Sequence, residues 1–218
     1  MSYQIAIDGP AGAGKSTVAR RVAKEKGFIY VDTGAMYRAM AYYLLTRKID
    51  PADGEAIEKG CIDADITIQY ENGEQVVLLN GENVNGMIRS EEVGNMASIS
   101  SKNPRVRERL THLQKELAKS NDVVMDGRDI GTCVLPDADV KVYLTASAGV
   151  RAKRRFHELT AKGERCDIKK IEEDIITRDK QDMNREIAPL RQAEDAVLLD
   201  ASDMSIDEVV SAILELCR

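Results

Sequence analysis

The sequence is poor in the residues that build metal and disulfide frameworks. It contains only two histidines and four cysteines, Cys61, Cys133, Cys166 and Cys217, which lie far apart. None of these cysteines belongs to a C-x-x-C pair or stands near histidines with the spacing of a zinc site. We therefore expect four reduced thiols, as is usual in the cytoplasm.

Long apolar runs and an excess of positive charge are missing as well. No stretch approaches the roughly 18 uncharged apolar residues of a membrane span, and the first apolar segment is too short for a secretory signal. The formal net charge is −6, so no global field favours nucleic acid. Arginine and lysine cluster between residues 151 and 191, where a solvated helix face is the common explanation and contacts from a few arginines to phosphates are the alternative. We expect a soluble, cytoplasmic protein without membrane or nucleic-acid partners, and nothing demands more than a monomer.

Against this background, residues 9–16 stand out because they match the phosphate-binding pattern G-x-x-x-x-G-K-[ST]. Residues 3–8 before them predict a β-strand, and residues 16–26 after them predict a helix. Glycines in such a loop let several backbone N–H groups converge on an anion, and the helix N-terminus adds partial positive charge. Lys15 can reach the outer phosphates, and the Ser16 hydroxyl can ligate Mg²⁺.

The rest of the chain predicts a single α/β domain over residues 1–218. Strands are expected at 3–8, 28–31, 122–125, 140–144 and 196–200, which gives a five-stranded parallel sheet with helices on both faces. Segments 66–70 and 75–79 flank an Asn-Gly turn, and 82–84 can add a third strand. This antiparallel patch predicts an inserted subdomain at about 63–87. A surface hairpin without a role in binding is the alternative.

Polar residues that follow the strands predict the site, because ligands bind outside the carboxyl ends of parallel strands. Asp32 and Thr33 follow one strand, and Asp126 closes another in the manner of a Walker B residue that orients Mg²⁺. Arg38 lies in the first turn of the next helix, where the helix dipole disfavours a cation unless an anionic ligand is its partner. An exposed arginine without a ligand explains that position equally well.

Two later helices carry further arginines. In the helix that begins at Pro104, Val106, Leu110, Leu113 and Leu117 form the expected core stripe, with Arg105, Arg107 and Arg109 off it. In the helix expected from 167 to 186, Arg178, Asp182 and Arg185 follow one face. That row can be a structural ladder of salt bridges or a mobile clamp on polyphosphate.

Three classes of phosphate-loop protein compete. A switch GTPase needs an N-K-x-D sequence, which is missing, and mechanical ATPases are usually longer and often basic or modular. A small phosphotransferase must bind two anionic substrates and exclude water, so it needs arginines outside the loop on segments able to close. Such arginines are present, namely Arg38, Arg107, Arg128, Arg178 and Arg185.

The motifs together resemble the bacterial cytidylate kinases over almost the whole chain. The matching stretches are residues 7–16, 32–38, 104–107, 126–132, 178–185 and 188–190, and Thr33 stands where that family often has serine. The resemblance implies a P-loop NTPase fold with a helical lid, and transfer of the ATP γ-phosphoryl group to CMP or dCMP with Mg²⁺. A kinase of UMP, AMP or another small phosphate acceptor on the same fold is the alternative.

The resemblance also implies roles for individual residues. A lid at about 154–166 should close over ATP, and Ser16 is the expected metal ligand. The acceptor phosphate would be bound by Arg38, Arg128 and Arg185, and the sugar by Arg178 and Asp182. The base would be bound by Ser98, Arg107 and Asp129, and Thr33 would also contact the substrate. The catalytic residues would be Lys15, Arg128, Arg178 and Arg185, and the ATP-binding residues Gly9, Pro10, Ala11, Gly12, Ala13, Gly14, Lys15, Ser16, Thr17 and Arg154.

Elementary chemistry adds one expectation about the base. Cytosine presents an N4 amino donor, for which a carboxylate is the natural acceptor, whereas uracil presents a carbonyl at that position. Asp129 is therefore the expected discriminator between CMP and UMP.

Overall fold

A computed structural model describes residues 2–217. The chain divides into two compact units, one formed by Met1–Phe28 with Asp122–Arg218 and the other by Ile29–Asn121. The phosphate loop lies in the first unit, and the expected β insertion lies in the second. Among the described residues, no helix is long and apolar enough to cross a membrane.

The first unit is built on parallel strands. β1 pairs with β6 and with β7, and β7 pairs with β8. The order of the whole sheet is β2-β6-β1-β7-β8, which confirms the expected five-stranded parallel sheet. The elements of this unit are β1 (Gln4–Asp8), α1 (Lys15–Lys26), β6 (Val123–Gly127), β7 (Val140–Thr145), α6 (Ala148–Ala161), α7 (Ile168–Asn184), β8 (Val197–Asp200) and α8 (Ile206–Leu216).

Burial in this unit follows the apolar pattern of the sequence. Ile5 and Ile7 of β1 are inaccessible to solvent, and so are Val123 and Val124 of β6. Helix α1 packs against β6 and α8 through the apolar stripe that its sequence predicts. The edge strand β8 differs, because Val197 and Leu198 remain 44% and 55% exposed.

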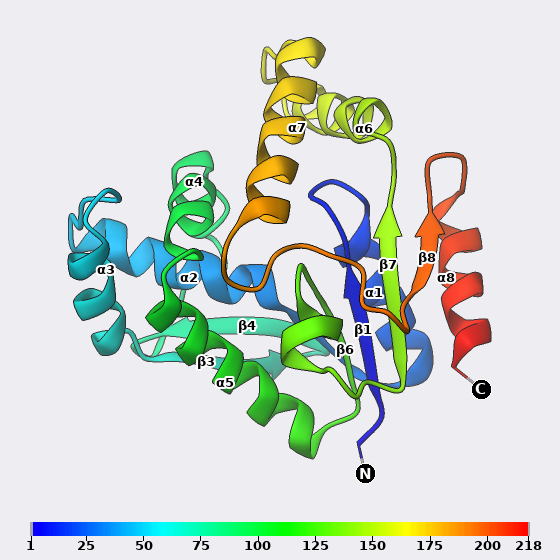
Figure 1. Cartoon of the computed structure of the whole chain (residues 1–218), viewed down its shortest axis with the longest axis horizontal. Coiled ribbons are helices and arrows are strands. Elements are labelled where there is room, and N and C mark those ends of the chain that lie inside the picture. The colour runs from blue at the N-terminus through cyan, green and yellow to red at the C-terminus, as the bar shows by residue number, and fades with distance from the viewer. Residues whose placement is uncertain (1, 218) are drawn as a thin grey trace. The chain divides into compact units, whose positions relative to one another are not determined.

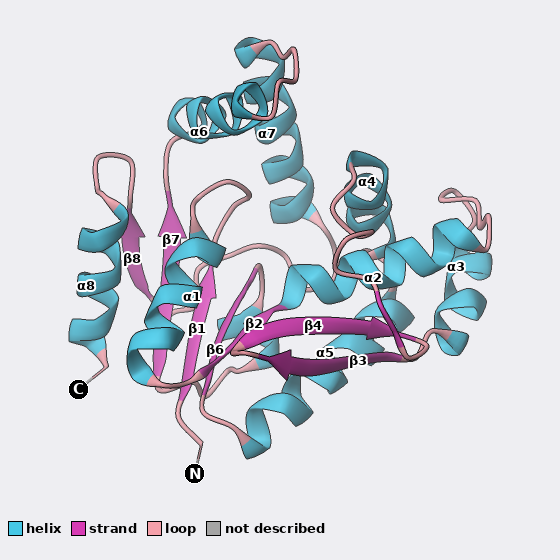
Figure 2. Ribbon diagram, turned by 180° about the vertical axis from the view of Figure 1, so that it is seen from behind, coloured by secondary structure: helices cyan, strands magenta, loops and turns pink. Residues whose placement is uncertain are grey.

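The second unit combines helices with a small antiparallel sheet, which confirms the expected insertion of strands (Figure 2). At the turn between β3 and β4, Asn72 and Gly73 both have positive φ, 52° and 80°, as an Asn-Gly hairpin requires. The elements are β2 (Ile29–Asp32), α2 (Thr33–Thr46), α3 (Gly54–Gly60), β3 (Ile66–Glu71), β4 (Glu74–Leu79), β5 (Glu82–Asn83), α4 (Glu91–Ser100) and α5 (Pro104–Ser120).

The buried face of helix α5 differs in part from the predicted core stripe. Val106 and Leu110 are buried as predicted, but the row continues in steps of four to Gln114 and Ala118, while Leu113 and Leu117 are only half-buried. Arg107 was expected off the stripe and is instead 4% exposed. It is enclosed because its guanidinium lies 5.5 Å from the centre of the Tyr37 ring and donates to the Ser101 carbonyl at 3.2 Å.

Candidate functional site

The phosphate loop begins where β1 ends. Gly9 has φ +145°, and a Cβ at this position would lie 1.9 Å from the carbonyl oxygen of Leu144 on β7, so only glycine fits. At the other end of the loop Lys15 opens α1, is 5% exposed, and donates from Nζ to the Pro10 carbonyl at 2.7 Å. The lysine therefore folds back over its own loop.

Two buried ionisable side chains at the loop, Lys15 and Asp8, have shifted pKa values. Burial lowers the pKa of Lys15, and the positive charge of Arg128 lowers it further. Burial raises the pKa of Asp8 to about 6, although its carboxylate accepts hydrogen bonds from the N–H groups of Ile130 (2.8 Å) and Gly131 (2.7 Å). An anion bound beside Lys15 would favour its charged form again.

Ser16 and Asp126 supply the oxygens expected of a Mg²⁺ site. The Ser16 hydroxyl donates to Oδ2 of Asp126 at 2.9 Å, and Asp126 is 5% exposed at the end of β6. A hydroxyl beside a carboxylate suits Mg²⁺, which prefers oxygen ligands and keeps several waters. These residues thus fit the metal that the phosphate loop implies.

Two arginine–carboxylate pairs join the end of β6 to the end of α7. Arg128 Nε lies 2.9 Å from Oδ2 of Asp182, and Arg185 Nη2 lies 3.2 Å from Oδ1 of Asp129. Both side chains of the second pair are at most 7% exposed. The expectation of one helical row through Arg185 is wrong, because α7 ends at Asn184 and Arg185 has an extended ψ of 142°. Arg178, about two turns before the end of this row, is exposed.

A third pair fixes the helices on which the lid is expected. Arg151 Nη2 on α6 lies 2.6 Å from Oδ2 of Asp179 on α7, and the two helices lie side by side (Figure 1). Arg151 Nη1 also donates to the Ala11 carbonyl in the phosphate loop at 3.0 Å. Arg154 donates to the carbonyls of Ala201 (2.7 Å) and Ala13 (3.4 Å). Both arginines therefore hold the phosphate loop through its carbonyl oxygens.

In the second unit, the predicted residues at the start of α2 form a compact group. Asp32 caps α2 by accepting from the Ala35 N–H at 2.8 Å, and its other carboxylate oxygen lies 3.1 Å from Nη2 of Arg38. Thr33, the first residue of the helix, is 3% exposed. Arg38 Nε is buried and has no hydrogen-bond partner.

Ser98 and Arg107 are brought near each other by α4 and α5. Arg107 donates to the carbonyl of Ser101, whose hydroxyl donates to the Ser98 carbonyl at 3.0 Å. Ser98 is half-buried. The four predicted residues of this unit, Thr33, Arg38, Ser98 and Arg107, thus lie on α2, α4 and α5.

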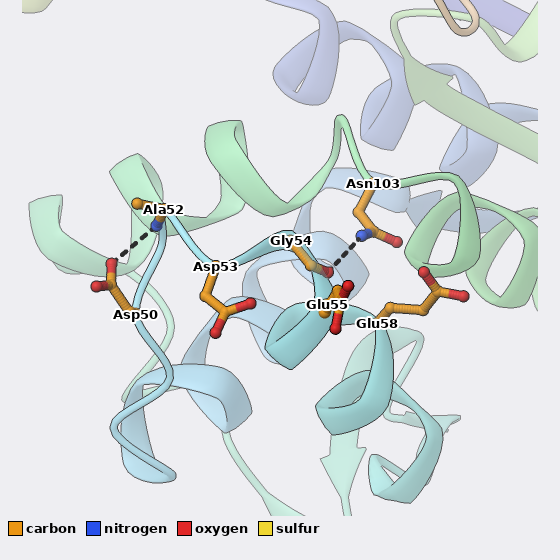
Figure 3. A pocket seen from close by; sticks show the side chains of 7 residues that line it. All are labelled: Asp50, Ala52, Asp53, Gly54, Glu55, Glu58 and Asn103. Carbon is orange, nitrogen blue, oxygen red and sulfur yellow. Dashed lines mark hydrogen bonds between the residues drawn. The ribbon is translucent and has the colours of Figure 1, made fainter.

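The pocket in Figure 3 is a different place in the second unit. Its lining carries the carboxylates of Asp50, Asp53, Glu55 and Glu58, while Asn103 donates to the Gly54 carbonyl at 3.2 Å. Four carboxylates would repel a nucleotide phosphate. We therefore assign no part of the nucleotide site to this pocket.

Fold and loop together define a P-loop phosphotransferase of the small-kinase type. Among solved structures, a shikimate kinase from Bacteroides thetaiotaomicron has a TM-score of 0.51 at 16% identity, covering 99% of this chain and 98% of that one. An uncharacterized protein from Eubacterium ventriosum has a TM-score of 0.54 at 12% identity, covering 98% and 97%. At these identities the likeness shows the fold alone.

Sequence comparison gives the family. The model of the family described as cytidylate kinase matches residues 5–218. A cytidylate kinase from Caldicellulosiruptor bescii is 51% identical, covering 97% of this chain and 94% of that protein. A cytidylate kinase from Shouchella clausii is 48% identical, covering 99% and 96%. The chain belongs to the cytidylate kinase family.

Several residues that shape these groups were missed from the sequence. Asp8 carried a signal, because it is an acidic residue that closes an apolar strand directly before the glycine-rich loop. Arg151 and Asp179 lie on different helices 28 residues apart, and no periodic pattern links them. Gln75 has the sequence context of an ordinary hairpin residue, but its side chain binds the main chain of Asp32.

The raised pKa of Asp8 predicts a pH dependence of stability. Its ordinary value of 3.8 becomes about 6 in the folded chain, so the folded state binds an extra proton between those values. The free energy of unfolding contributed by this group therefore falls as the pH rises through that interval, by of the order of 3 kcal/mol in total. We expect the calorimetric unfolding temperature of the wild type to fall as the pH rises through this interval. In Asp8→Asn this contribution to the fall should be absent.

Asp137→Asn, at an exposed aspartate of the same unit, is the control and should keep the wild-type profile. An Asp8→Asn variant with the wild-type dependence would contradict the assignment.

Proposed function

We propose that this chain transfers the γ-phosphoryl group of ATP to a phosphate oxygen of CMP or dCMP, giving ADP and CDP or dCDP. The observation that carries the proposal is the pair of arginine–carboxylate contacts at the end of β6, Arg128–Asp182 and Arg185–Asp129, in the same unit as an intact phosphate loop. Membership of the cytidylate kinase family supports the same reaction.

On the ATP side, the loop from Gly9 to Ser16 with Thr17 would hold the phosphates through its N–H groups and the Lys15 ammonium. Ser16 and Asp126 would hold Mg²⁺, which supplies neutralisation of negative charge on the phosphate oxygens. Arg154 belongs to the proposed lid, about residues 154–166, which excludes water when it closes. We also propose that the two units form one kinase domain.

On the acceptor side, we assign the phosphate of CMP to Arg38, Arg128 and Arg185. The sugar is assigned to Arg178 and Asp182, and the base to Ser98, Arg107 and Asp129. Thr33 is assigned to the substrate side without a defined part of the ligand.

The transfer itself needs positioning more than covalent chemistry. An oxygen of the acceptor phosphate forms a bond to the γ-phosphorus while the bond from the γ-phosphorus to the bridging β–γ oxygen breaks. The electron pair of the broken bond, and its negative charge, stay on the β-phosphate of ADP. Guanidinium groups of Arg128 and Arg185 offset the repulsion between the two phosphates and stabilise charge on the transferring group. Their carboxylate partners hold these guanidinium groups in place before substrate arrives.

The test is release of ADP from Mg·ATP with CMP, dCMP, UMP, AMP and GMP offered in turn. Turnover with CMP or dCMP far above the others is expected. Turnover with another acceptor would retain a P-loop kinase and reject the assigned base site. Hydrolysis of ATP without dependence on any acceptor would reject the kinase proposal.

The same assay tests Asp129 as the residue that selects cytosine. Asp129→Asn replaces one carboxylate oxygen by an amino group, which can donate to the uracil carbonyl. We expect the ratio of kcat/KM for CMP to that for UMP to fall by about tenfold or more, the value of one good base contact. Asp174→Asn, at an exposed position on α7, is the control. An unchanged ratio in Asp129→Asn would place base selection elsewhere.

A further inference from the structure

The small antiparallel sheet reaches the start of α2 through one side-chain amide. Oε1 of Gln75 on β4 accepts from the N–H of Asp32 at 2.8 Å, and its Nε2 donates to the carbonyl of Asp32 at 3.2 Å. A single glutamine thus satisfies both backbone groups of one residue, where β2 ends and α2 begins. Such a two-point contact fixes the direction of the Asp32 main chain.

The side chain of Asp32 passes that restraint on to Arg38. One oxygen is held by the Ala35 N–H, and the other faces Nη2 of Arg38. Gly34 leaves the space for this pair, because a Cβ there would lie 3.1 Å from Nη1 of Arg38 and 3.2 Å from Oδ1 of Asp32. Nε of Arg38 has no partner, so the guanidinium keeps unused donor capacity.

Gln75 is itself firmly placed. Nδ2 of Asn85 donates to the Gln75 carbonyl at 2.9 Å, and its Oδ1 accepts from the Val77 N–H at 3.0 Å, so Asn85 continues the ladder of β4 beyond β5. Tyr70, opposite Gln75 on β3, donates from its hydroxyl to the Tyr30 carbonyl of β2 at 3.1 Å. The sheet is therefore attached to β2 at two successive places.

We propose that Gln75 is a positioning residue for the acceptor phosphate. The small sheet holds Asp32 through Gln75, and Asp32 in turn holds the Arg38 guanidinium in the orientation that grips the monophosphate of CMP. This role rests on the proposed function, in which Arg38 binds that phosphate. It gives the inserted sheet a task in catalysis that needs no contact between the sheet and either nucleotide.

The test is steady-state kinetics of Gln75→Met, which keeps the length of the side chain and removes both hydrogen bonds. We expect KM for CMP to rise about tenfold, the size of one to two lost hydrogen bonds, while KM for ATP stays within about twofold. The matched control is Gln69→Met, at an exposed glutamine of the same hairpin, which should leave both constants unchanged. Thermal unfolding of each variant is measured alongside.

A double-mutant cycle separates positioning from a general structural role. In an Arg38→Met background, Gln75→Met should add no further rise in KM for CMP, because the group that it positions is gone. A full additional rise there, an unchanged KM for CMP in Gln75→Met alone, or an equal rise in KM for ATP would each overturn the proposal. If Gln75→Met unfolds, Gln75→Glu is used in its place. It retains the acceptor for the Asp32 N–H and replaces the donor by a carboxylate oxygen that repels the Asp32 carbonyl, so KM for CMP should rise in this variant too.

Wild-type turnover is measured first in this series. A wild type without CMP turnover would refute the proposed function, whereas normal CMP turnover with an unaffected Gln75→Met would refute the role of Gln75 alone.

Discussion

Replacement of Lys15 by methionine is expected to lower kcat for phosphoryl transfer to CMP by about 10²–10³-fold. Lys15 is 5% exposed and folds over the phosphate loop onto the Pro10 carbonyl. We propose that its ammonium binds the outer phosphates of ATP. Methionine retains the apolar stem and removes the charge. The loss should appear mainly in kcat, because the charge that develops during transfer is neutralised in the transition state.

Lys24→Met, at an exposed lysine of the same helix, is the control and should retain wild-type turnover. Circular dichroism and unfolding temperature show whether Lys15→Met is folded. A folded Lys15→Met variant with wild-type kcat would remove this residue from the catalytic group.

The second large effect concerns stability. Asp179→Ala should lower the free energy of unfolding by about 3–5 kcal/mol, because it leaves the Arg151 guanidinium buried without its carboxylate. The two side chains are 6% and 12% exposed and are joined by contacts of 2.6 and 3.2 Å. Urea titration monitored by circular dichroism measures the change. Asp174→Ala, at an exposed aspartate of α7, should stay within about 0.5 kcal/mol of the wild type.

The double variant Arg151→Met with Asp179→Leu distinguishes a lost charge pair from lost packing. Removing both charges restores most of the stability if the unpaired guanidinium is the cause of the loss. This double variant should bind ATP more weakly than the wild type even if its stability is restored, because the contact from Arg151 to the Ala11 carbonyl is gone. A double variant as unstable as Asp179→Ala would contradict this explanation.

Local patterns in the sequence were sufficient for the phosphate loop and the strands. Gly9 illustrates why, since its conformation and its approach to Leu144 leave no other residue possible, and such constraints are visible as motif positions. The same holds for Asn72 and Gly73, whose turn needs two positive φ values. Where backbone geometry restricts the residue type, the sequence records the structure directly.

Contacts between distant segments could not be read in this way. A ladder of salt bridges within one helix was one of the two explanations for the row of Arg178, Asp182 and Arg185. Asp182 and Arg185 instead pair with Arg128 and Asp129, more than 50 residues away. Arg107 was placed off the core stripe of α5 because it does not follow the apolar spacing of that helix. Its burial depends on Tyr37 of another helix, which a helical wheel of α5 cannot contain.

The exposed edge strand β8 has a consequence for the behaviour of the chain in solution. An edge strand with free N–H and C=O groups and apolar side chains such as Val197 and Leu198 is a template for pairing with a second molecule. Here the strand is only four residues long and ends in Asp200, whose negative charge opposes such pairing. A variant that lengthened β8 or neutralised Asp200 would exchange this protection for a surface prone to aggregation.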